Sequence, residues 1–401
     1  MTPRTNKFMM GAFFIALAIY LIWNAINRPR IFVLQSYSEN YLWTKNVNDA
    51  IHGVFDTSFY DVKYHFMDTK RHSDPDFKRI AGSLARKQIN DWKPDILIAV
   101  DDNAQSLVSS CYIDNSKVAT KDRENISAKT KDILGRCFPQ HPDLKIIFSG
   151  IGAEPKDYGF RGQENVTGIL ERMDVPALSE ALLIIANKMD KKKLRVVAPI
   201  DDSTSGVYNT NSLKRLKQEM LSFNISIDIQ VLSTFKQWQQ TINDANNNAD
   251  VLLFSNYHTI KCNDKKYSKH VPPNKLIEWT NHNSDIIGLG AWGFYFANGG
   301  MFAVGVSPFE QGKIAARMAL DIIENNTIAK DINIETTHQS IIFMRQVNML
   351  YHDLKMPRIY EAFARVTGNY LECSDKTCTK DLNKLKAEKN NSIVNICNDS
   401  Q

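Results

Sequence analysis

Beyond residue 30 the chain alternates short apolar runs with longer amphipathic segments. The first apolar runs have the length of strands and lie at residues 31–35, 62–67, 95–100 and 145–149. After the first run, Val47, Ala50, Ile51, Val54 and Phe55 recur at the spacing of one helical face, and a similar set follows the second run at residues 77–84. A strand followed by an amphipathic helix is the repeating unit of a mainly parallel sheet, so the pattern predicts an α/β fold.

The same rhythm resumes in the second half of the chain. Strands are predicted at residues 194–200, 226–231, 250–255, 285–291, 301–306 and 340–347, with helices around Leu182, Leu216 and Trp238 and over 310–324. The β-rich segment 165–170 interrupts the series, and we interpret it as a crossing into a second lobe. We therefore expect two doubly wound parallel-sheet lobes: residues 30–163 with 302–326 form lobe I, and residues 164–301 with 327–355 form lobe II.

Two polar segments fall outside this rhythm. Residues 112–140 are interpreted as an insertion, because a structureless loop of that length is uncommon inside a compact lobe. Residues 356–401 form a polar, Cys-containing C-terminal tail. Cys111 and Cys137 bracket the insertion, while Cys373 and Cys378 lie in the tail. Cysteines in polar loops favour disulfides and an oxidising compartment, with free thiols as the alternative.

The N-terminal segment has the character of a membrane anchor. Residues 8–26 carry no charge and are just long enough to cross a bilayer. A cleaved secretory signal is the alternative, but Trp23-Asn24-Ala25 is a poor cleavage site and a strand is predicted from Ile31. We therefore expect residues 1–29 to be an N-terminal transmembrane helix, as an anchor or an uncleaved signal.

Composition and charge narrow the class of protein. The 401 residues are 43% hydrophobic and 23% charged, which excludes a disordered, fibrous or polytopic membrane chain. The formal net charge is +5, but residues 1–30 contain four basic residues and no acid, so the rest of the chain is close to neutral. A neutral body has no electrostatic footprint for nucleic acid, and we expect no nucleic-acid partner.

Candidate ligand-binding residues follow the strands, since ligands of open parallel sheets bind outside the carboxyl ends of the strands. They combine aromatic rings, hydroxyls, amides and carboxylates, which suits a small solute with a flat body and a polar or cationic end. The set is Ser36, Tyr37, Tyr41, Trp43, Asp101, Asp102, Asn103, Ser149, Gly150, Asp201, Asp202, Ser203, Tyr257, Trp292 and Phe294. For any single Asp or Ser, capping of the next helix is the alternative. For the tyrosines and Trp43, packing in a lid is equally compatible.

Motifs of catalysis and metal binding do not assemble in the sequence. It contains no nucleophile elbow, no HExxH, no phosphate-binding loop and no dinucleotide fingerprint. The pairs Asp101/Asp102 and Asp201/Asp202 are compatible with acid/base work, but adjacent carboxylates on one loop usually divide between capping and solvent. We expect no catalytic residues, no metal site and no cofactor.

Further motifs keep a characteristic order along residues 30–355. They are Ser36-Tyr37 with Tyr41 and Trp43, Met67-Asp68-Thr69-Lys70-Arg71, Lys93-Pro94-Asp95 before Asp101-Asp102, Phe148-Ser149-Gly150-Ile151, Asn165-Val166-Thr167-Gly168, and Phe309-Glu310-Gln311-Gly312. In this order they resemble the ABC-transporter substrate-binding family of the tryptophan/tyrosine-type periplasmic component. The resemblance implies a type I periplasmic binding fold whose two lobes close on a small solute without chemistry. The anchor, the insertion and the Cys-bearing tail depart from the family pattern.

Three functions remain open on this basis. The first is a non-catalytic extracytoplasmic solute-binding protein of an ABC-type uptake system, whose solute is an aromatic amino acid or related amine and whose expected partner is an ABC permease. The second is a membrane-tethered sensor or accessory domain on the same fold. The third is a two-lobed, glycosyltransferase-like enzyme that uses the Asp pairs. For the first, we expect the periplasmic face of a bacterial inner membrane, or the periplasm after cleavage.

Overall fold

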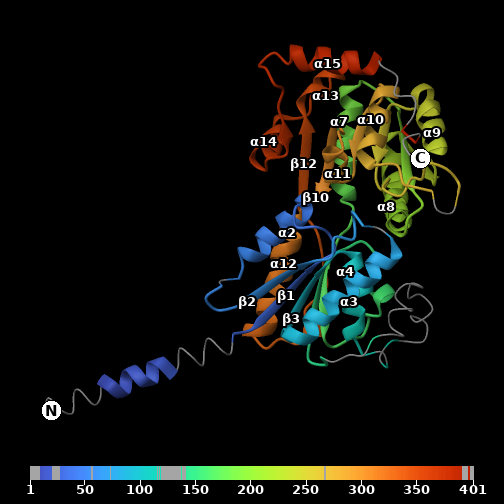
Figure 1. Cartoon of the computed structure of the whole chain (residues 1–401). Coiled ribbons are helices and arrows are strands. Elements are labelled where there is room, and N and C mark those ends of the chain that lie inside the picture. The colour runs from blue at the N-terminus through green and yellow to red at the C-terminus, as the bar shows by residue number, and fades with distance from the viewer. Residues whose placement is uncertain are drawn as a thin grey trace. The chain divides into compact units, whose positions relative to one another are not determined.

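The chain forms two compact units, each with its own sheet (Figure 1). This computed structural model describes residues 10–19, 28–55, 57–72, 74–114, 116, 118, 137, 141–265, 268–390 and 396–397, except for the side chains of residues 204, 205, 207, 208 and 388–390. Unit 1 comprises Met1–Leu170 and Pro308–Thr336, and unit 2 comprises Glu171–Ser307 and Thr337–Gln401.

Unit 1 is built on a six-stranded sheet whose pairings are parallel. The strand order is β11 (Glu335–Thr336), β5 (Val166–Leu170), β4 (Lys145–Ile151), β3 (Ile96–Val100), β1 (Arg30–Gln35), β2 (Asp61–Phe66). Its helices are α2 (Leu42–His52), α3 (Pro75–Trp92), α4 (Asp102–Leu107) and α12 (Pro308–Glu324), with short 3-10 turns η1 (Ser109–Tyr112), η3 (Pro155–Tyr158) and η5 (Ala329–Asp331).

Alternating side chains of the strands build the core of unit 1. On β1, Ile31 and Val33 face a cluster that includes Val47 of α2 and Ala315 of α12. On the opposite face, Phe32 meets the ring of Trp92 from α3, at 6.1 Å between centroids. Both faces of the sheet are therefore covered by helices, as the continuous apolar runs of the strands require.

Helix α3 begins where the sequence signals a start. Asp74 is its N-cap and accepts a hydrogen bond from the backbone N–H of Phe77 at 2.8 Å, and Pro75 occupies the first helical position. The helix ends at Lys93, which has a φ of 51°. These local signals set where α3 begins and where the chain turns toward β3.

Unit 2 has a seven-stranded sheet with one antiparallel pairing among those described, between β10 and β12. The strand order is β13 (Tyr370–Leu371), β12 (Ser340–Arg345), β10 (Phe302–Val306), β9 (Ile287–Gly290), β8 (Val251–Phe254), β6 (Leu194–Asp201), β7 (Ile225–Leu232). The helices are α7 (Val175–Lys188), α8 (Thr204–Met220), η4 (Leu221–Phe223), α9 (Phe235–Asn248), α10 (Pro273–Asn283), α11 (Gly293–Ala297), α13 (Gln346–Tyr351), α14 (Arg358–Val366) and α15 (Thr379–Asn390).

Two strands lie elsewhere than the sequence pattern suggested. We interpreted residues 165–170 as a crossing, but β5 pairs with β4 and is a full strand of unit 1. We assigned residues 302–306 to lobe I, but β10 pairs with β9 and β12 in unit 2. The chain passes between units at 170–171, 307–308 and 336–337, six to ten residues beyond the expected boundaries, so residues 327–336, which we assigned to lobe II, belong to unit 1. Sequence periodicity identifies a strand but does not say which neighbour it pairs with.

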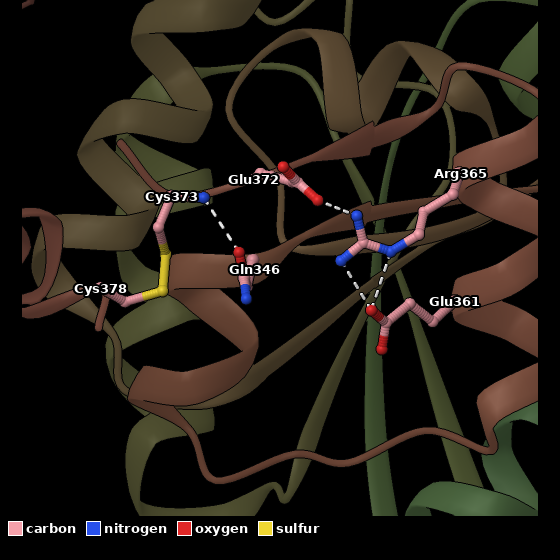
Figure 2. A network of polar contacts seen from close by, with 6 residues as sticks. All are labelled: Gln346, Glu361, Arg365, Glu372, Cys373 and Cys378. Carbon is pink, nitrogen blue, oxygen red and sulfur yellow. Dashed lines mark hydrogen bonds and ion pairs between the residues drawn. A yellow bond between two sulfur atoms is a disulfide. The ribbon is translucent and has the colours of Figure 1, made fainter. Parts of the chain in front are cut away.

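The tail beyond residue 356 is more structured than its polar composition suggested. Helix α14 buries Tyr360 and Ala364, and β13 extends the sheet by pairing with β12. Figure 2 shows Arg365 of α14 bound to the carboxylates of Glu361 and Glu372. In the same view, the backbone N–H of Cys373 donates to the side chain of Gln346 at 3.0 Å.

The six cysteines form three disulfides. Cys111 is bonded to Cys137, at the two ends of the predicted insertion, and Cys373 is bonded to Cys378 in the tail. The sequence did not single out the third bridge, Cys262–Cys397, which joins residues 135 positions apart within unit 2. Apart from Cys137 and the few described residues up to 118, the insertion lies outside the described residues.

The N-terminal anchor is described only in part. Residues 10–19 form a helix (Figure 1), and the rest of the predicted apolar segment lies outside the described residues. Within the part of the chain that the structure describes, no helix has both the length and the apolar character needed to cross a bilayer. The transmembrane helix therefore stays a prediction.

Candidate functional site

The carboxyl ends of β1, β3 and β4 lie side by side in unit 1. In the sheet register Gln35 pairs with Val100, and Val100 pairs with Ser149. Ser36-Tyr37, Asp101-Asp102 and Gly150 follow these paired residues, so the sheet brings together three of the predicted segments.

Ser36 and Asn103 hold the loops of this edge in place. The Ser36 hydroxyl donates to the carbonyl oxygen of Val100 at 2.6 Å and accepts from the backbone N–H of Ala104 at 2.8 Å. The backbone N–H and the hydroxyl of Thr69 both donate to the Ser36 carbonyl oxygen, and the Asn103 amide donates to the Thr69 hydroxyl at 3.0 Å. Since Ser36 is fully buried, its role is to position the loops rather than to meet a solute.

Asp101 combines a strained backbone with a perturbed carboxyl group. It is the N-cap of α4 with φ 70° and ψ 164°, a region that favours glycine. Its carboxylate accepts from the backbone N–H of Asp102 at 2.7 Å and from the phenol of Tyr37. Burial, followed by the charge of Asp102, raises the pKa of Asp101 to about 7. Burial and the neighbouring Asp101 raise the pKa of Tyr37 as well, so the phenol stays protonated and donates a hydrogen bond to Asp101.

Asp102 is held by a second phenol. Its Oδ1 accepts from the hydroxyl of Tyr158 at 2.5 Å and from the backbone N–H of Ala153 at 3.3 Å. Burial and the charge of Asp102 raise the pKa of Tyr158. Two adjacent carboxylates therefore each have a tyrosine as donor, and both remain partly exposed to solvent.

Tyr37, Tyr41 and Lys70 form an aromatic cage beside Asp101. The two rings meet edge to face, with centroids 5.4 Å apart and an interplanar angle of 83°. The ammonium of Lys70 lies 4.2 Å from the Tyr41 centroid and 4.9 Å from that of Tyr37. It also donates to the Tyr41 hydroxyl at 2.6 Å. Rings and a carboxylate around one ammonium are a common arrangement for recognising cations.

The remaining predicted residues of unit 1 face the scaffold. The side-chain oxygen of Gln311, on α12, accepts from the backbone N–H of Gly150 at 2.8 Å, and Ser149 also contacts Gln311. Trp43 is half-buried and packs against the core between the sheet and α12. These residues shape the edge of the site without presenting polar groups to it.

In unit 2 the Asp pair differs from its counterpart in unit 1. The Asp201 side chain is only 1% exposed. Its Oδ1 accepts from the hydroxyl and the backbone N–H of Ser203, and its Oδ2 accepts from the backbone N–H of Thr259 at 3.1 Å. Asp202 is exposed and accepts from the Ser233 hydroxyl at 2.7 Å. Asp201 therefore ties two loops together and Ser203 caps α8, which is the helix-capping alternative stated for such residues.

Aromatic rings gather at the strand ends of unit 2. Tyr257 is fully buried and Trp292 nearly so, with the indole N–H directed to the Ser255 hydroxyl at 3.3 Å. Phe294 is partly exposed, stacks with Trp292 at 6.4 Å and meets His258 edge to face at 4.5 Å. The accessible aromatic surface at this edge therefore belongs to Phe294 and His258, with Trp292 behind them.

Sequence reasoning missed three participants of these clusters. Lys70 follows β2 within the motif Met67–Arg71, which was noted for its order along the chain but not as a source of site residues. Tyr158 is the last residue of η3, and no periodicity points to it. His258 directly follows the predicted Tyr257, so its place after a strand was an available signal. Within the described residues, no group of three or more His, Cys, Asp or Glu side chains is placed to hold a metal ion.

Comparisons with known proteins identify the fold. No protein-family model matches the sequence, and no curated protein matches it. Among solved structures, the chain is similar to an ABC domain in complex with L-Trp from Streptococcus pneumonia, with a TM-score of 0.55 and 11% identity over 85% of this chain and 100% of that chain. It is also similar to a ligand-free, open substrate-binding protein with adhesive properties from Clostridium difficile, with a TM-score of 0.54 and 13% identity over 82% and 96% of the two chains.

A third similar structure is a conserved domain protein from Vibrio cholerae, with a TM-score of 0.55 and 12% identity over 86% of this chain and all of that one. At such identities the similarity concerns the fold alone. It confirms the predicted α/β fold with two parallel-sheet lobes, of the type I periplasmic binding kind.

Proposed function

We propose that this chain is a non-catalytic, extracytoplasmic solute-binding protein of an ABC-type uptake system, whose solute is an aromatic amino acid or a related amine. The observation that carries the proposal is the cluster of Tyr37, Tyr41, Asp101 and Asp102 at the carboxyl ends of β1 and β3. Parallel α/β sheets bind their ligands at this edge, and the cluster supplies both ring faces and negative charge.

The chemistry of the cluster favours binding over turnover. Each carboxylate accepts a hydrogen bond from a tyrosine whose pKa is raised, so both phenols keep their protons and act as donors rather than as bases. The strained backbone of Asp101 instead aims a carboxylate at one point, which suits recognition of a positive group. These features favour a binding protein over the enzyme alternative.

The two units contribute differently to this proposal. The proposed solute contacts lie in unit 1, which carries the charged groups of the cluster. Phe294 and His258 are accessible rings of unit 2 and are described by themselves. Asp201 is not part of the proposed solute contacts, because its oxygens are engaged by Ser203 and Thr259. The three chain passages at 170–171, 307–308 and 336–337 are the places where we expect hinge rotation to close the units on a solute.

The test is a titration of the purified full-length protein with the common amino acids and aromatic amines, followed by tryptophan fluorescence and by native mass spectrometry. We expect an aromatic solute with an amino group to bind. Asp101→Asn should weaken this binding at least about tenfold, because a hydrogen bond to a charged group contributes about 1.5–3 kcal/mol. Asp202→Asn is the matched control, because Asp202 is exposed, lies in unit 2 and accepts a hydrogen bond from the Ser233 hydroxyl. Absence of any bound amine, or equal losses in both variants, would contradict the proposal.

We also propose that residues 1–29 anchor the protein at the periplasmic face of the inner membrane, beside an ABC permease. The support is the uncharged segment 8–26 and the disulfides, which suit an oxidising compartment. The full-length protein should stay in the membrane after carbonate washing, because charge does not hold a spanning helix. A soluble form that begins near residue 27 would show cleavage instead.

A further inference from the structure

The side chain of Lys70 occupies a site that is built for an ammonium ion. Its nitrogen has one phenolic oxygen at 2.6 Å and two ring centroids within 5 Å. Its charge also acts on Asp101, where it opposes part of the rise in pKa that burial and Asp102 cause. We propose that Tyr37, Tyr41 and Asp101 form a binding site for the ammonium group of a primary amine, and that Lys70 is a tethered occupant which an incoming amine displaces. The inference rests on the proposed function in using the same site, and it adds the ligand group and its competitor.

The charges of the cluster favour a cation over an anion as the incoming group. Asp101 and Asp102 are adjacent carboxylates, and their mutual repulsion contributes to the raised pKa of Asp101. An anionic ligand would add a third negative charge beside them. An ammonium ion would replace that of Lys70 with the same charge and the same ring contacts, so the balance of the site would be preserved.

The loop that carries Lys70 allows the side chain to leave without refolding. Its neighbour Thr69 is buried and donates two hydrogen bonds to the Ser36 carbonyl oxygen. On the other side, the guanidinium of Arg71 is bound to both carboxylate oxygens of Asp68. The backbone is therefore pinned on both sides of Lys70, whose residue is exposed and whose four-carbon stem can rotate into solvent.

Displacement has a measurable consequence. A site that is blocked in most molecules shows an apparent affinity reduced by the fraction that is open. If Lys70 fills the cage in about nine molecules of ten, its removal tightens amine binding about tenfold. If Lys70 were instead a partner for a ligand carboxylate, its removal would weaken binding.

The experiment uses n-propylammonium as the probe, because it reproduces the end of the lysine side chain. The full-length protein and its Lys70→Ala variant are titrated at pH 8 and constant ionic strength, with ligand-observed NMR as the readout. We expect Lys70→Ala to bind the probe about tenfold more tightly than the parent. Lys87→Ala, which removes an exposed cation of α3 outside the cage, should bind as the parent does, and propionate should bind to none of them.

A double variant tests the cage itself. Tyr41 is the N-cap of α2 without a capping side-chain bond, so Tyr41→Ala leaves that helix start intact. In the Lys70→Ala background it should abolish the gained affinity. Equal affinity of parent and Lys70→Ala, no propylammonium binding by Lys70→Ala, or a gain that survives Tyr41→Ala would each overturn the inference.

The outcome is separable from that of the proposed function. If Lys70→Ala binds propylammonium but no amino acid or aromatic amine binds to either protein, the ammonium site stands and the solute proposal fails. If the parent binds an aromatic amine and Lys70→Ala binds it no better, the solute proposal stands and the tethered-occupant inference fails.

Discussion

The backbone conformation of Asp101 predicts that glycine is more stable than alanine at this position. At Asp201, where the backbone is extended, the order should be reversed. Asp101→Gly and Asp101→Ala both delete the carboxylate and its bonds to Asp102 and Tyr37. Only alanine keeps a Cβ at φ 70°, where strain costs about 1–3 kcal/mol. Glycine loses about 0.5–1 kcal/mol more through the entropy of the unfolded chain. The glycine variant should therefore be the more stable, by up to about 2.5 kcal/mol.

Asp201 supplies the matched comparison. Asp201 is the last residue of strand β6, where the backbone is extended and a Cβ causes no strain. Glycine therefore has no advantage over alanine at this position. Asp201→Gly should be less stable than Asp201→Ala by about 0.5–1 kcal/mol. Both Asp201 variants should also lose about 1–3 kcal/mol to the unpaired N–H groups of Ser203 and Thr259.

Urea denaturation followed by circular dichroism measures these differences as shifts in midpoint. The four variants are compared pairwise within each position, so the lost side-chain contacts cancel in each pair. If Asp101→Gly is less stable than Asp101→Ala, by the margin seen at Asp201, the strain assigned to Asp101 does not exist and neither does the argument that it aims the carboxylate.

Three further predictions concern stability. Because the pKa of Asp101 is raised to about 7, the folded state binds this proton more tightly than the unfolded chain does. The free energy of unfolding should therefore fall as the pH rises from about 4 to about 7, which urea titrations at each pH measure. A fall of the same size in Asp101→Asn would contradict this assignment. A Cβ on Gly312 would lie closer than 3.0 Å to the Val47 carbonyl oxygen, so Gly312→Ala should cost about 1–3 kcal/mol. Gly53→Ala is the control, because the nearest atom to its Cβ would be at 3.4 Å; it should be neutral or stabilising, and thermal melts of both variants measure the difference. Alkylation without reductant should label no cysteine, and full labelling of Cys262 in the parent would exclude the Cys262–Cys397 bridge. Cys397→Ser should lower the free energy of unfolding by up to about 5 kcal/mol, because this bridge closes a long loop.

Local patterns along the chain were enough to predict most of the elements. Apolar runs and helical spacing predicted the strands of both sheets except β5, β11 and β13, together with the helices α2, α3, α7, α8, α9 and α12. They could do so because burial on a sheet imposes period-2 and period-3.6 patterns on the residues themselves. Helix α10 was not predicted. Its apolar residues are few, and its sequence is interrupted by polar and charged side chains. The tail strand β13 was missed because it contributes only two residues to its sheet.

Contacts between residues that are far apart in the sequence depend on the tertiary structure. Asp101 and Asp201 follow strands in the same way and look equivalent in sequence, yet one is partly exposed beside two tyrosines and the other is buried under two loops. Lys70 meets Tyr41 only because β1 and β2 pair in parallel and their loops emerge at the same edge. A one-dimensional pattern records which side chains are apolar. Which polar groups share a hydrogen bond is set by strand order and loop path, and these are determined by contacts between segments far apart in the chain.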